Sequence, residues 1–123
     1  MYAIIDLETS GGKFNQEKII EIAIVIFDGK KISKKFSTLV NPGIKVDYYV
    51  QKLTGIKKSQ LDKEYSFNKY AKKVLNMVEN MILVGHNVEY DYRVLKNEFK
   101  LCKIDYSSET ICTIEMAKQS YKD

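Results

Sequence analysis

Hydrophobic positions in the first third of this 123-residue chain follow the short runs typical of β-strands. Residues 2–6, 19–27 and 32–40 are rich in Ile, Val, Phe and Tyr, and each run predicts one strand. Asp28-Gly29 lies between the last two runs and predicts a two-residue hairpin turn, because glycine adopts a positive φ without strain. Asn41-Pro42-Gly43 then closes a meander of three consecutive strands.

The remaining two thirds of the chain favour helices separated by single strands. A short helix is expected within residues 53–61, starting after Thr54 or Gly55, and Ser66 is placed to cap the next helix. The later elements are a helix over 67–79, a strand over 82–85, a helix over 88–100, a strand over 110–112 and a helix from about Thr113. This order predicts an α/β sandwich with a mixed sheet, whose later strands are made parallel by helical crossovers.

The composition, 45% hydrophobic and 29% charged, fits one soluble globular domain. The longest apolar run, Ile22–Phe27, is far shorter than the roughly 20 residues of a membrane helix, so no membrane association is expected. The N-terminus also lacks the features of a signal peptide. Cys102 and Cys112 are too few for a disulfide framework and are expected to be reduced thiols, which predicts a cytoplasmic location.

Charge gives limited information about partners. Twenty Lys and Arg residues against 16 Asp and Glu residues give a net charge of +4, which is less basic than a dedicated DNA-binding protein. Arg93 is the only arginine, so phosphate contacts would come mostly from lysines. The lysine pairs at 30–31, 34–35, 57–58 and 72–73 are scattered along the chain, and we interpret most of them as solvated surface.

Two carboxylates directly follow the first apolar strand. Asp6 and Glu8 are two residues apart, so their side chains point to the same face of the strand. Two adjacent anions repel unless a cation lies between them, and carboxylate oxygens suit Mg²⁺ or Mn²⁺. The pair therefore indicates a metal site, although an Asp-x-Glu at a strand end also fits two solvated acids.

A third acid lies on the apolar stripe of the helix predicted over 88–100. Asp91 falls between Val88 and Leu95 on that stripe. A buried, unpaired carboxylate is costly, so Asp91 is expected to be neutral, to be paired, or to bind a metal. An ion pair with a lysine or a helix-capping role would also explain its position.

Three further polar residues have both a functional and a structural interpretation. Glu21, inside an apolar strand, faces either the same site or solvent. His86 is the only histidine, and holding the strand-to-helix turn through hydrogen bonds fits it better than a general-base role. Asn87 is placed to cap the helix that follows.

The segment Ile4–Gly11 closely resembles the first motif, Asp-x-Glu-Thr-Thr-Gly, of the DEDD (DnaQ-like) 3′–5′ exonucleases. Gly85–Asp91 resembles the second motif of that family, His-Asn-x-x-Phe-Asp. Further segments that match in the same order are Ile20–Ala23, Leu39–Pro42, Leu53–Ile56 and Thr110–Thr113. The resemblance extends over nearly the whole chain and is nearest to the DNA polymerase III epsilon-subunit type.

The resemblance implies a ribonuclease H-like three-layer α/β sandwich with a five-stranded mixed sheet. The implied activity is 3′–5′ exonucleolytic hydrolysis of 3′-terminal phosphodiesters by two Mg²⁺ or Mn²⁺ ions, in proofreading or repair. Single-stranded DNA is the expected substrate, with RNA left open. A DNA polymerase subunit or a fused GIY-YIG nuclease domain is the partner implied by the family.

The resemblance also implies roles for individual residues. Asp6 would bridge the two metals, Glu8 would complete one site, and Asp91 would hold the other. The backbone around Leu7, Glu8 and Thr9 would cradle the terminal nucleotide, and Ile56 and Tyr90 would pack on its base or sugar. The substrate-binding residues expected on this basis are Leu7, Thr9, Ile56, Asn87 and Tyr90.

The chain departs from the family pattern at its end. The family has a fourth carboxylate and, in this subtype, a histidine five residues before it. His86 already matches the second motif, and Asp123 lies too early and has no partner histidine. We therefore expect residues 1–123 to be an exonuclease domain that lacks its last motif and is impaired when alone. The alternative is a non-catalytic nucleic-acid- or polymerase-binding module.

Overall fold

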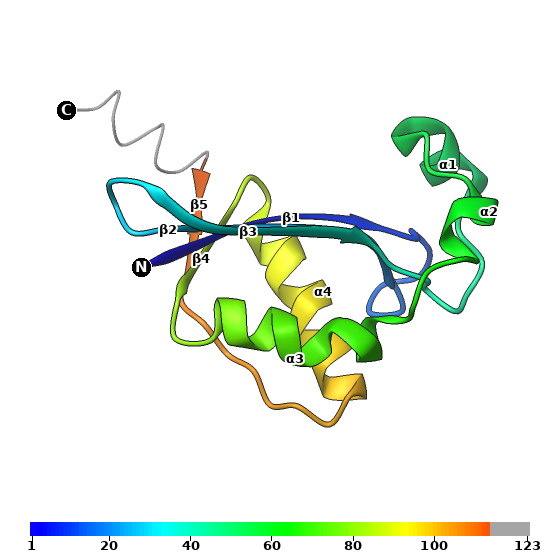
Figure 1. Cartoon of the computed structure of the whole chain (residues 1–123). Helices are drawn as coiled ribbons and strands as arrows, with labels where there is room; N and C mark the ends of the chain where they lie inside the picture. Colours follow the sequence, from blue (N-terminus) through cyan, green and yellow to red (C-terminus); the bar gives the residue numbers. More distant parts are fainter. Residues whose placement is uncertain (114–123) are drawn as a thin grey trace.

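A computed structural model describes residues 1–113 and places five strands in one mixed sheet (Figure 1). In chain order the strands are β1 (Tyr2–Thr9), β2 (Ile19–Phe27), β3 (Ile32–Leu39), β4 (Ile82–Gly85) and β5 (Thr110–Cys112). Their order across the sheet is β3-β2-β1-β4-β5. The first three strands pair antiparallel, whereas β4 and β5 run parallel to β1, so the predicted five-stranded mixed sheet is confirmed.

Two long helices cover one face of the sheet. The helices are α1 (Tyr48–Thr54), α2 (Lys58–Leu61), α3 (Phe67–Val78) and α4 (Val88–Leu101). In Figure 1 the sheet is seen nearly edge-on with α3 and α4 beneath it, while α1 and α2 lie beyond the carboxyl end of β1. Alternate residues of β1 face α3 and α4, because side chains alternate along a strand.

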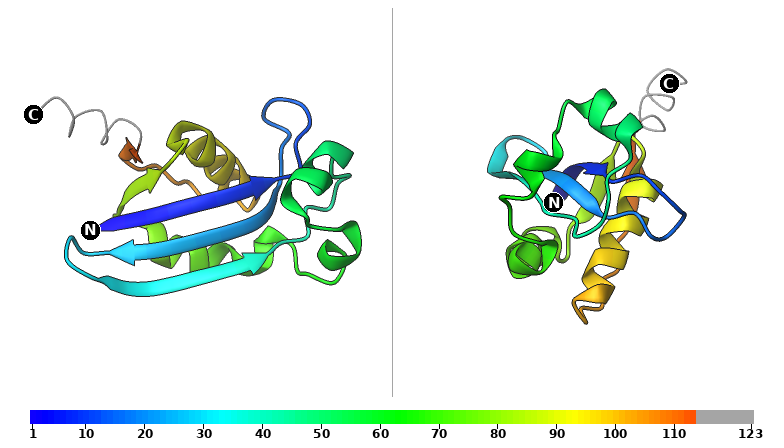
Figure 2. Two further views of the ribbon diagram at one scale, coloured as in Figure 1. Left: turned by 90° about the horizontal axis from the view of Figure 1, so that it is seen from above. Right: turned by 90° about the vertical axis from the view of Figure 1, so that its right-hand side faces the viewer.

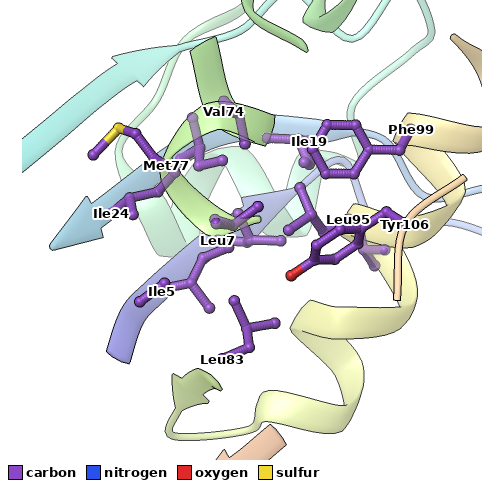
Figure 3. Packing of buried hydrophobic residues seen from close by; sticks show 14 of the residues in the cluster. Ile5, Leu7, Ile19, Ile24, Val74, Met77, Leu83, Leu95, Phe99 and Tyr106 are labelled. Carbon is purple, nitrogen blue, oxygen red and sulfur yellow. The ribbon is translucent and has the colours of Figure 1, made fainter. Parts of the chain in front are cut away.

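The core lies between the sheet and these two helices. Figure 3 shows side chains from β1, α3 and α4 meeting there, among them Ile5, Val74 and Leu95. Phe99 of α4 packs edge-on against Phe67 at a centroid distance of 5.4 Å and also contacts Tyr106. This packing fixes α4 under the sheet, so the first turn of α4 is held close to the ends of β1 and β4.

The region between β3 and α3 differs from the prediction. The short helix expected within residues 53–61 is present as α2, and a second short helix, α1, precedes it and was not predicted. Gly55 has a φ of 75° and ends α1 in the left-handed conformation, and α2 begins three residues later. The residues before it lack a clear helical apolar stripe, which is why the sequence pattern missed α1.

The β2–β3 connection is also longer than the predicted two-residue turn. Phe27 pairs with Ile32, so four residues form the loop. The Asp28 carboxylate accepts the backbone N–H groups of Lys30 and Lys31 at 2.8 and 2.9 Å. This side-chain bonding favours a wider loop than glycine alone would suggest.

Neither predicted helix cap uses its side chain. Ser66 and Asn87 occupy the N-cap positions of α3 and α4, but neither side chain makes a capping hydrogen bond. The helix expected from about Thr113 lies outside the described residues. Across residues 1–113, no helix has both the length and the apolar character needed to span a membrane.

Candidate active site

The carboxyl end of β1 places Asp6 and Glu8 on the sheet face opposite α3 and α4. Their neighbours Ile5 and Leu7 are buried on the helix side, whereas Asp6 is exposed and Glu8 is half-buried. The alternation of β1 therefore separates two apolar anchors from two acids that share one face.

Strands β1 and β4 separate just before these acids. Their parallel pairing runs from Tyr2–Ile82 to Ile4–Val84, and β4 ends at Gly85. Beyond Ile4, β1 has no strand partner on this side within residues 1–113. A crevice at the carboxyl ends of parallel strands is where α/β sheets usually bind ligands.

Asp91 lies at this crevice from the helix side. It is the fourth residue of α4, and only 6% of it is exposed. A Cβ atom built on Gly85 would lie 3.0 Å from Oδ2 of Asp91 and 3.2 Å from the Ile5 carbonyl oxygen. Glycine at position 85 therefore lets the Asp91 carboxylate lie against the ends of β1 and β4.

The three carboxylates interact electrostatically. Burial raises the pKa of Asp91 to about 7, and the charges of Asp6 and Glu8 add to this shift. Burial also raises the pKa of Glu8, with further contributions from Asp6 and Glu21. In residues 1–113 no Lys, Arg or His forms a salt bridge with Asp91, so the ion pair considered above is not found there. Within the described residues, the cluster is a concentration of negative charge without a counterion.

Glu21 belongs to the same face. It pairs in register with Glu8 across the β1–β2 ladder, and it is half-buried rather than fully solvated. Four carboxylates therefore surround the end of β1: Asp6, Glu8, Glu21 and Asp91.

The chemistry of this cluster fits a hard divalent cation, because all of its donors are carboxylate oxygens. Its present geometry is open. Within residues 1–113, no three His, Cys, Asp or Glu side chains lie close enough together to hold a metal ion. A metal would therefore require these side chains to rotate toward one another.

A hydrogen bond joins the two sides of the crevice. The hydroxyl groups of Thr9 and Tyr90 lie 2.6 Å apart, linking the end of β1 to the first turn of α4. Thr9 follows Glu8, and Tyr90 precedes Asp91, so this bond fixes the spacing between the two acid-bearing segments. The sequence pattern gave no indication of the bond.

The loop between β1 and β2 is fastened to α4 beside Tyr90. Arg93 donates two hydrogen bonds to the Glu17 carboxylate, at 2.8 and 3.1 Å, and a third to the Asn15 side chain. Its guanidinium also lies over the rings of Phe14 and Tyr90, 4.2 and 5.2 Å from their centroids. The only arginine of the chain thus connects this loop to the wall of the candidate site.

Glu98 is a second buried acid of α4 that sequence reasoning missed. Only 1% of it is exposed; it forms an ion pair with Lys18 and accepts the Ile19 backbone N–H at 2.9 Å. A signal was available, because Glu98 lies two helical turns beyond Asp91 on the same side of the helix.

The remaining predicted site residues lie in different surroundings. The Leu7 side chain packs in the core, so only its backbone is available at the crevice. Ile56 is 8% exposed and packs with Ile20, Val46 and Leu61 in a small second core, rather than presenting an open surface. Asn87 is exposed at the start of α4.

His86 is exposed at the same turn. Its carbonyl oxygen accepts a hydrogen bond from the Cys112 thiol, but its imidazole makes none within residues 1–113. The hydrogen bonds expected from the histidine ring are therefore absent from the described part of the chain.

Known proteins are similar to this chain in sequence and in fold. The chain is 29% identical over 121 residues to a 3′-5′ exonuclease DinG of Staphylococcus haemolyticus, and 30% identical to one of Staphylococcus aureus. These matches cover 98% of this chain but only 13% and 14% of the relatives. The chain therefore spans a small part of their length.

Solved structures of exonucleases superpose on nearly the whole chain. Exonuclease X, in complex with 5′ overhanging duplex DNA, matches with a TM-score of 0.73 and 27% identity over 98% of this chain and 64% of its own. The nuclease domain of 3′hExo, a DEDDh family member bound to rAMP, has a TM-score of 0.78 at 22% identity, over 99% of this chain and 70% of its own, and shares the fold. The family model described as exonuclease, RNase_T, matches residues 3–123. The chain belongs to this exonuclease family.

Proposed function

We propose that this chain is a 3′–5′ exonuclease domain that hydrolyses the 3′-terminal phosphodiester of nucleic acid, with single-stranded DNA as its preferred substrate. The main support is the carboxylate cluster of Asp6, Glu8 and Asp91 beside the crevice between β1 and β4, which has no counterion among residues 1–113. The relatives named 3′-5′ exonuclease support the same direction of attack. A role in proofreading or repair belongs to this proposal.

Asp6, Glu8 and Asp91 would hold two Mg²⁺ or Mn²⁺ ions. When bound, such ions activate the attacking water and stabilise the leaving 3′ oxygen. The three carboxylates supply the negative charge that attracts the ions, and the raised pKa of Asp91 reflects the cost of holding that charge without them. The family resemblance implies that Asp6 would contact both ions, and Asp6 lies on the exposed face of β1.

The walls of the crevice would position the terminal nucleotide. The Tyr90 ring is held by the Thr9 hydroxyl at one end and by the Arg93 guanidinium over its face. A base or sugar packed on this ring would be bound without regard to sequence, as an exonuclease requires. The backbone of Leu7 to Thr9 and the exposed Asn87 complete the proposed contacts.

The wider assignments rest on the family resemblance. A DNA polymerase subunit or a fused GIY-YIG nuclease domain is the proposed partner, and a proofreading-subunit type is the proposed subtype. The free Cys102 and Cys112 thiols support the proposed cytoplasmic location.

The test is release of mononucleotides from labelled single-stranded oligonucleotides in Mg²⁺ or Mn²⁺. It uses the 123-residue chain and a gene product extended beyond Asp123. Asp6→Ala should abolish turnover, and Asp62→Ala serves as a matched control because Asp62 is an exposed acid that pairs with Lys58 and does not belong to the carboxylate cluster. EDTA should stop the wild-type reaction.

Full activity of Asp6→Ala, or activity that survives EDTA, would overturn the metal mechanism. Oligonucleotide binding with no metal-dependent release in either version would favour the non-catalytic module instead. Release from a labelled 5′ end would contradict the proposed direction.

A further inference from the structure

Three of the four lysine pairs that are scattered in the sequence come together at one edge of the fold. Pair 30–31 lies in the β2–β3 loop, pair 34–35 on the edge strand β3, and pair 72–73 on α3. Figure 2 shows β3 as the outer strand, with α3 beneath the sheet on this side. A groove of about 590 Å³ between them is lined by Lys34, Lys35, Lys73, Asn76 and Met77. We call these lysines, together with Lys69, the β3–α3 basic surface.

Acidic residues do not balance this surface. Residues 28–37 and 66–78 contain seven lysines and a single acid, Asp28. The Asp28 carboxylate is already engaged by two backbone N–H groups of its own loop. Among residues 1–113, none of these lysines forms a salt bridge. The ammonium groups are therefore available to an anionic partner.

Aromatic rings hold two of the lysines in place. The Lys73 ammonium lies 4.5 Å from the centroid of Phe36, and the Lys69 ammonium lies 5.0 Å from that of Tyr65. Such contacts restrict long side chains while leaving their charged ends in solvent. The surface combines fixed cations with aromatic faces, a combination typical of single-stranded nucleic-acid binding.

The strand registers place one lysine of this surface, Lys35, on the sheet face of the carboxylate cluster, whereas Lys34 and Lys73 lie around the β3 edge on the helix side. Ile4 pairs with Val25, and Val25 pairs with Lys35, so Lys35 shares the sheet face of Asp6. Lys35 lies two strands across from Ile4, a lateral distance of about 10 Å at the usual strand spacing. A hollow of about 300 Å³ over β2 and β3 is lined by Ala23, Ile24, Val25, Lys35, Phe36 and Ser37. An extended strand with its end at the acids can therefore reach Lys35 across the sheet.

We propose that the β3–α3 basic surface binds the phosphate backbone of the substrate strand several nucleotides away from the end at the carboxylate cluster. The identity of the strand rests on the proposed function. Lysines on an exposed edge strand also prevent edge-to-edge pairing, but that role involves only Lys34 and Lys35. It gives no reason for three further lysines on α3 beside them.

The test compares two triple variants with the same change in charge. Lys34→Gln/Lys35→Gln/Lys73→Gln removes the cations that line the groove. Lys96→Gln/Lys100→Gln/Lys103→Gln removes three lysines of α4 and the turn after it, which line a different hollow. We measure the binding of fluorescent single-stranded DNA in EDTA, so that no hydrolysis occurs. The two DNA lengths, about 20 and about 4 nucleotides, bracket the usual size of a single-strand binding site.

The groove variant should bind the long strand at least about tenfold more weakly than wild type at 0.1 M salt, as loss of three phosphate contacts implies. Its slope of log affinity against log salt should fall by about 2, at roughly 0.7 per phosphate contact. Affinity for the short strand and the behaviour of the α4 control should stay within about twofold, since neither involves these phosphate contacts.

Equal losses in both triple variants would show a general charge effect and overturn the proposal. Unchanged affinity of the groove variant for the long strand, or an equal loss for the short strand, would also overturn it. The same holds if self-association on size-exclusion chromatography is the only change in the groove variant. Length-dependent binding without metal-dependent hydrolysis would overturn the proposed function alone. Hydrolysis without length-dependent binding would overturn only the proposed surface.

Discussion

Two buried acids on α4 have opposite surroundings. Glu98 forms an ion pair with Lys18 and accepts the Ile19 backbone N–H. Asp91, two turns earlier on the same helix, faces Asp6 and Glu8 and has a pKa raised to about 7. Both acids are almost fully buried, so burial alone does not distinguish them, but their bonding partners differ. The Glu98 carboxylate has an ion-pair and a hydrogen-bond partner within the chain and links α4 to the start of β2. Asp91 has no counterion among the described residues.

The largest effect expected from this contrast is on catalysis. Asp91→Asn should lower metal-dependent exonuclease turnover by about 10²–10⁴-fold, the usual cost of losing one catalytic group. The folded state should be no less stable, because the substitution removes like-charge repulsion. Turnover and a urea unfolding curve are measured on the same sample. Near-wild-type turnover of this variant would place the catalytic acids elsewhere.

Glu98 should show the reverse behaviour. Glu98→Ala should lower the free energy of unfolding by about 3–5 kcal/mol, because it leaves the Lys18 charge and the Ile19 N–H unpaired. Chemical denaturation measures the loss. The milder Glu98→Gln keeps an acceptor oxygen, so its folded fraction should retain turnover within a few-fold. A stable Glu98→Ala protein with abolished turnover would make Glu98 functional and remove the contrast.

The raised pKa of Asp91 should also make the stability of the protein depend on pH. Between the ordinary carboxyl pKa and about 7, folded Asp91 holds a proton that the unfolded chain has released. The metal-free free energy of unfolding should therefore decrease as pH rises through this window. Asp91→Asn should remove most of that decrease, about 4 kcal/mol at 1.36 kcal/mol per pKa unit. Parallel pH profiles for wild type and variant would contradict the raised pKa.

The smallest effect concerns the fastening of the β1–β2 loop. Arg93→Lys keeps a positive charge but loses the two-pronged bond to Glu17 and the flat contact with Tyr90. Hydrogen exchange in residues 11–18 should become faster, with a global loss of only about 1 kcal/mol, as for a partly exposed ion pair. Lys96→Met is the matched control, because Lys96 lies over Tyr92 on the same helix. Equal acceleration in both variants would remove the specific role of Arg93.

The sequence predicted the strands and long helices well, because their burial follows simple periodicities. The run Ile19–Phe27 forms β2 as expected, and Phe67–Val78 forms α3 within one residue of its predicted end. The first segment was underestimated, because β1 continues through the acids to Thr9. A pattern of apolar residues stops where polar side chains begin, although the backbone pairing does not.

The part of the candidate site that depends on the spacing of residues within one strand or one helix was predictable from the sequence. Asp6 and Glu8 share a face through the two-residue repeat of a strand, and Asp91 was marked by its apolar stripe. Partners distant in sequence were not predictable in this way. Lys18 lies 80 residues from Glu98, and Thr9 lies 81 residues from Tyr90. Likewise, the lysine pairs became a surface only when β3 and α3 were placed side by side.

The central claim, that Asp91 with Asp6 and Glu8 forms a divalent metal site while Glu98 does not take part, is tested most directly by calorimetric titration of Mn²⁺. Wild type, Asp91→Asn and Glu98→Gln are compared at one pH above 7, where Asp91 is ionised. We predict that wild type and Glu98→Gln bind alike and that Asp91→Asn loses at least about tenfold in affinity, as expected on removing a coordinating group. Wild-type affinity in Asp91→Asn, or no Mn²⁺ binding by the wild-type chain, would contradict the account.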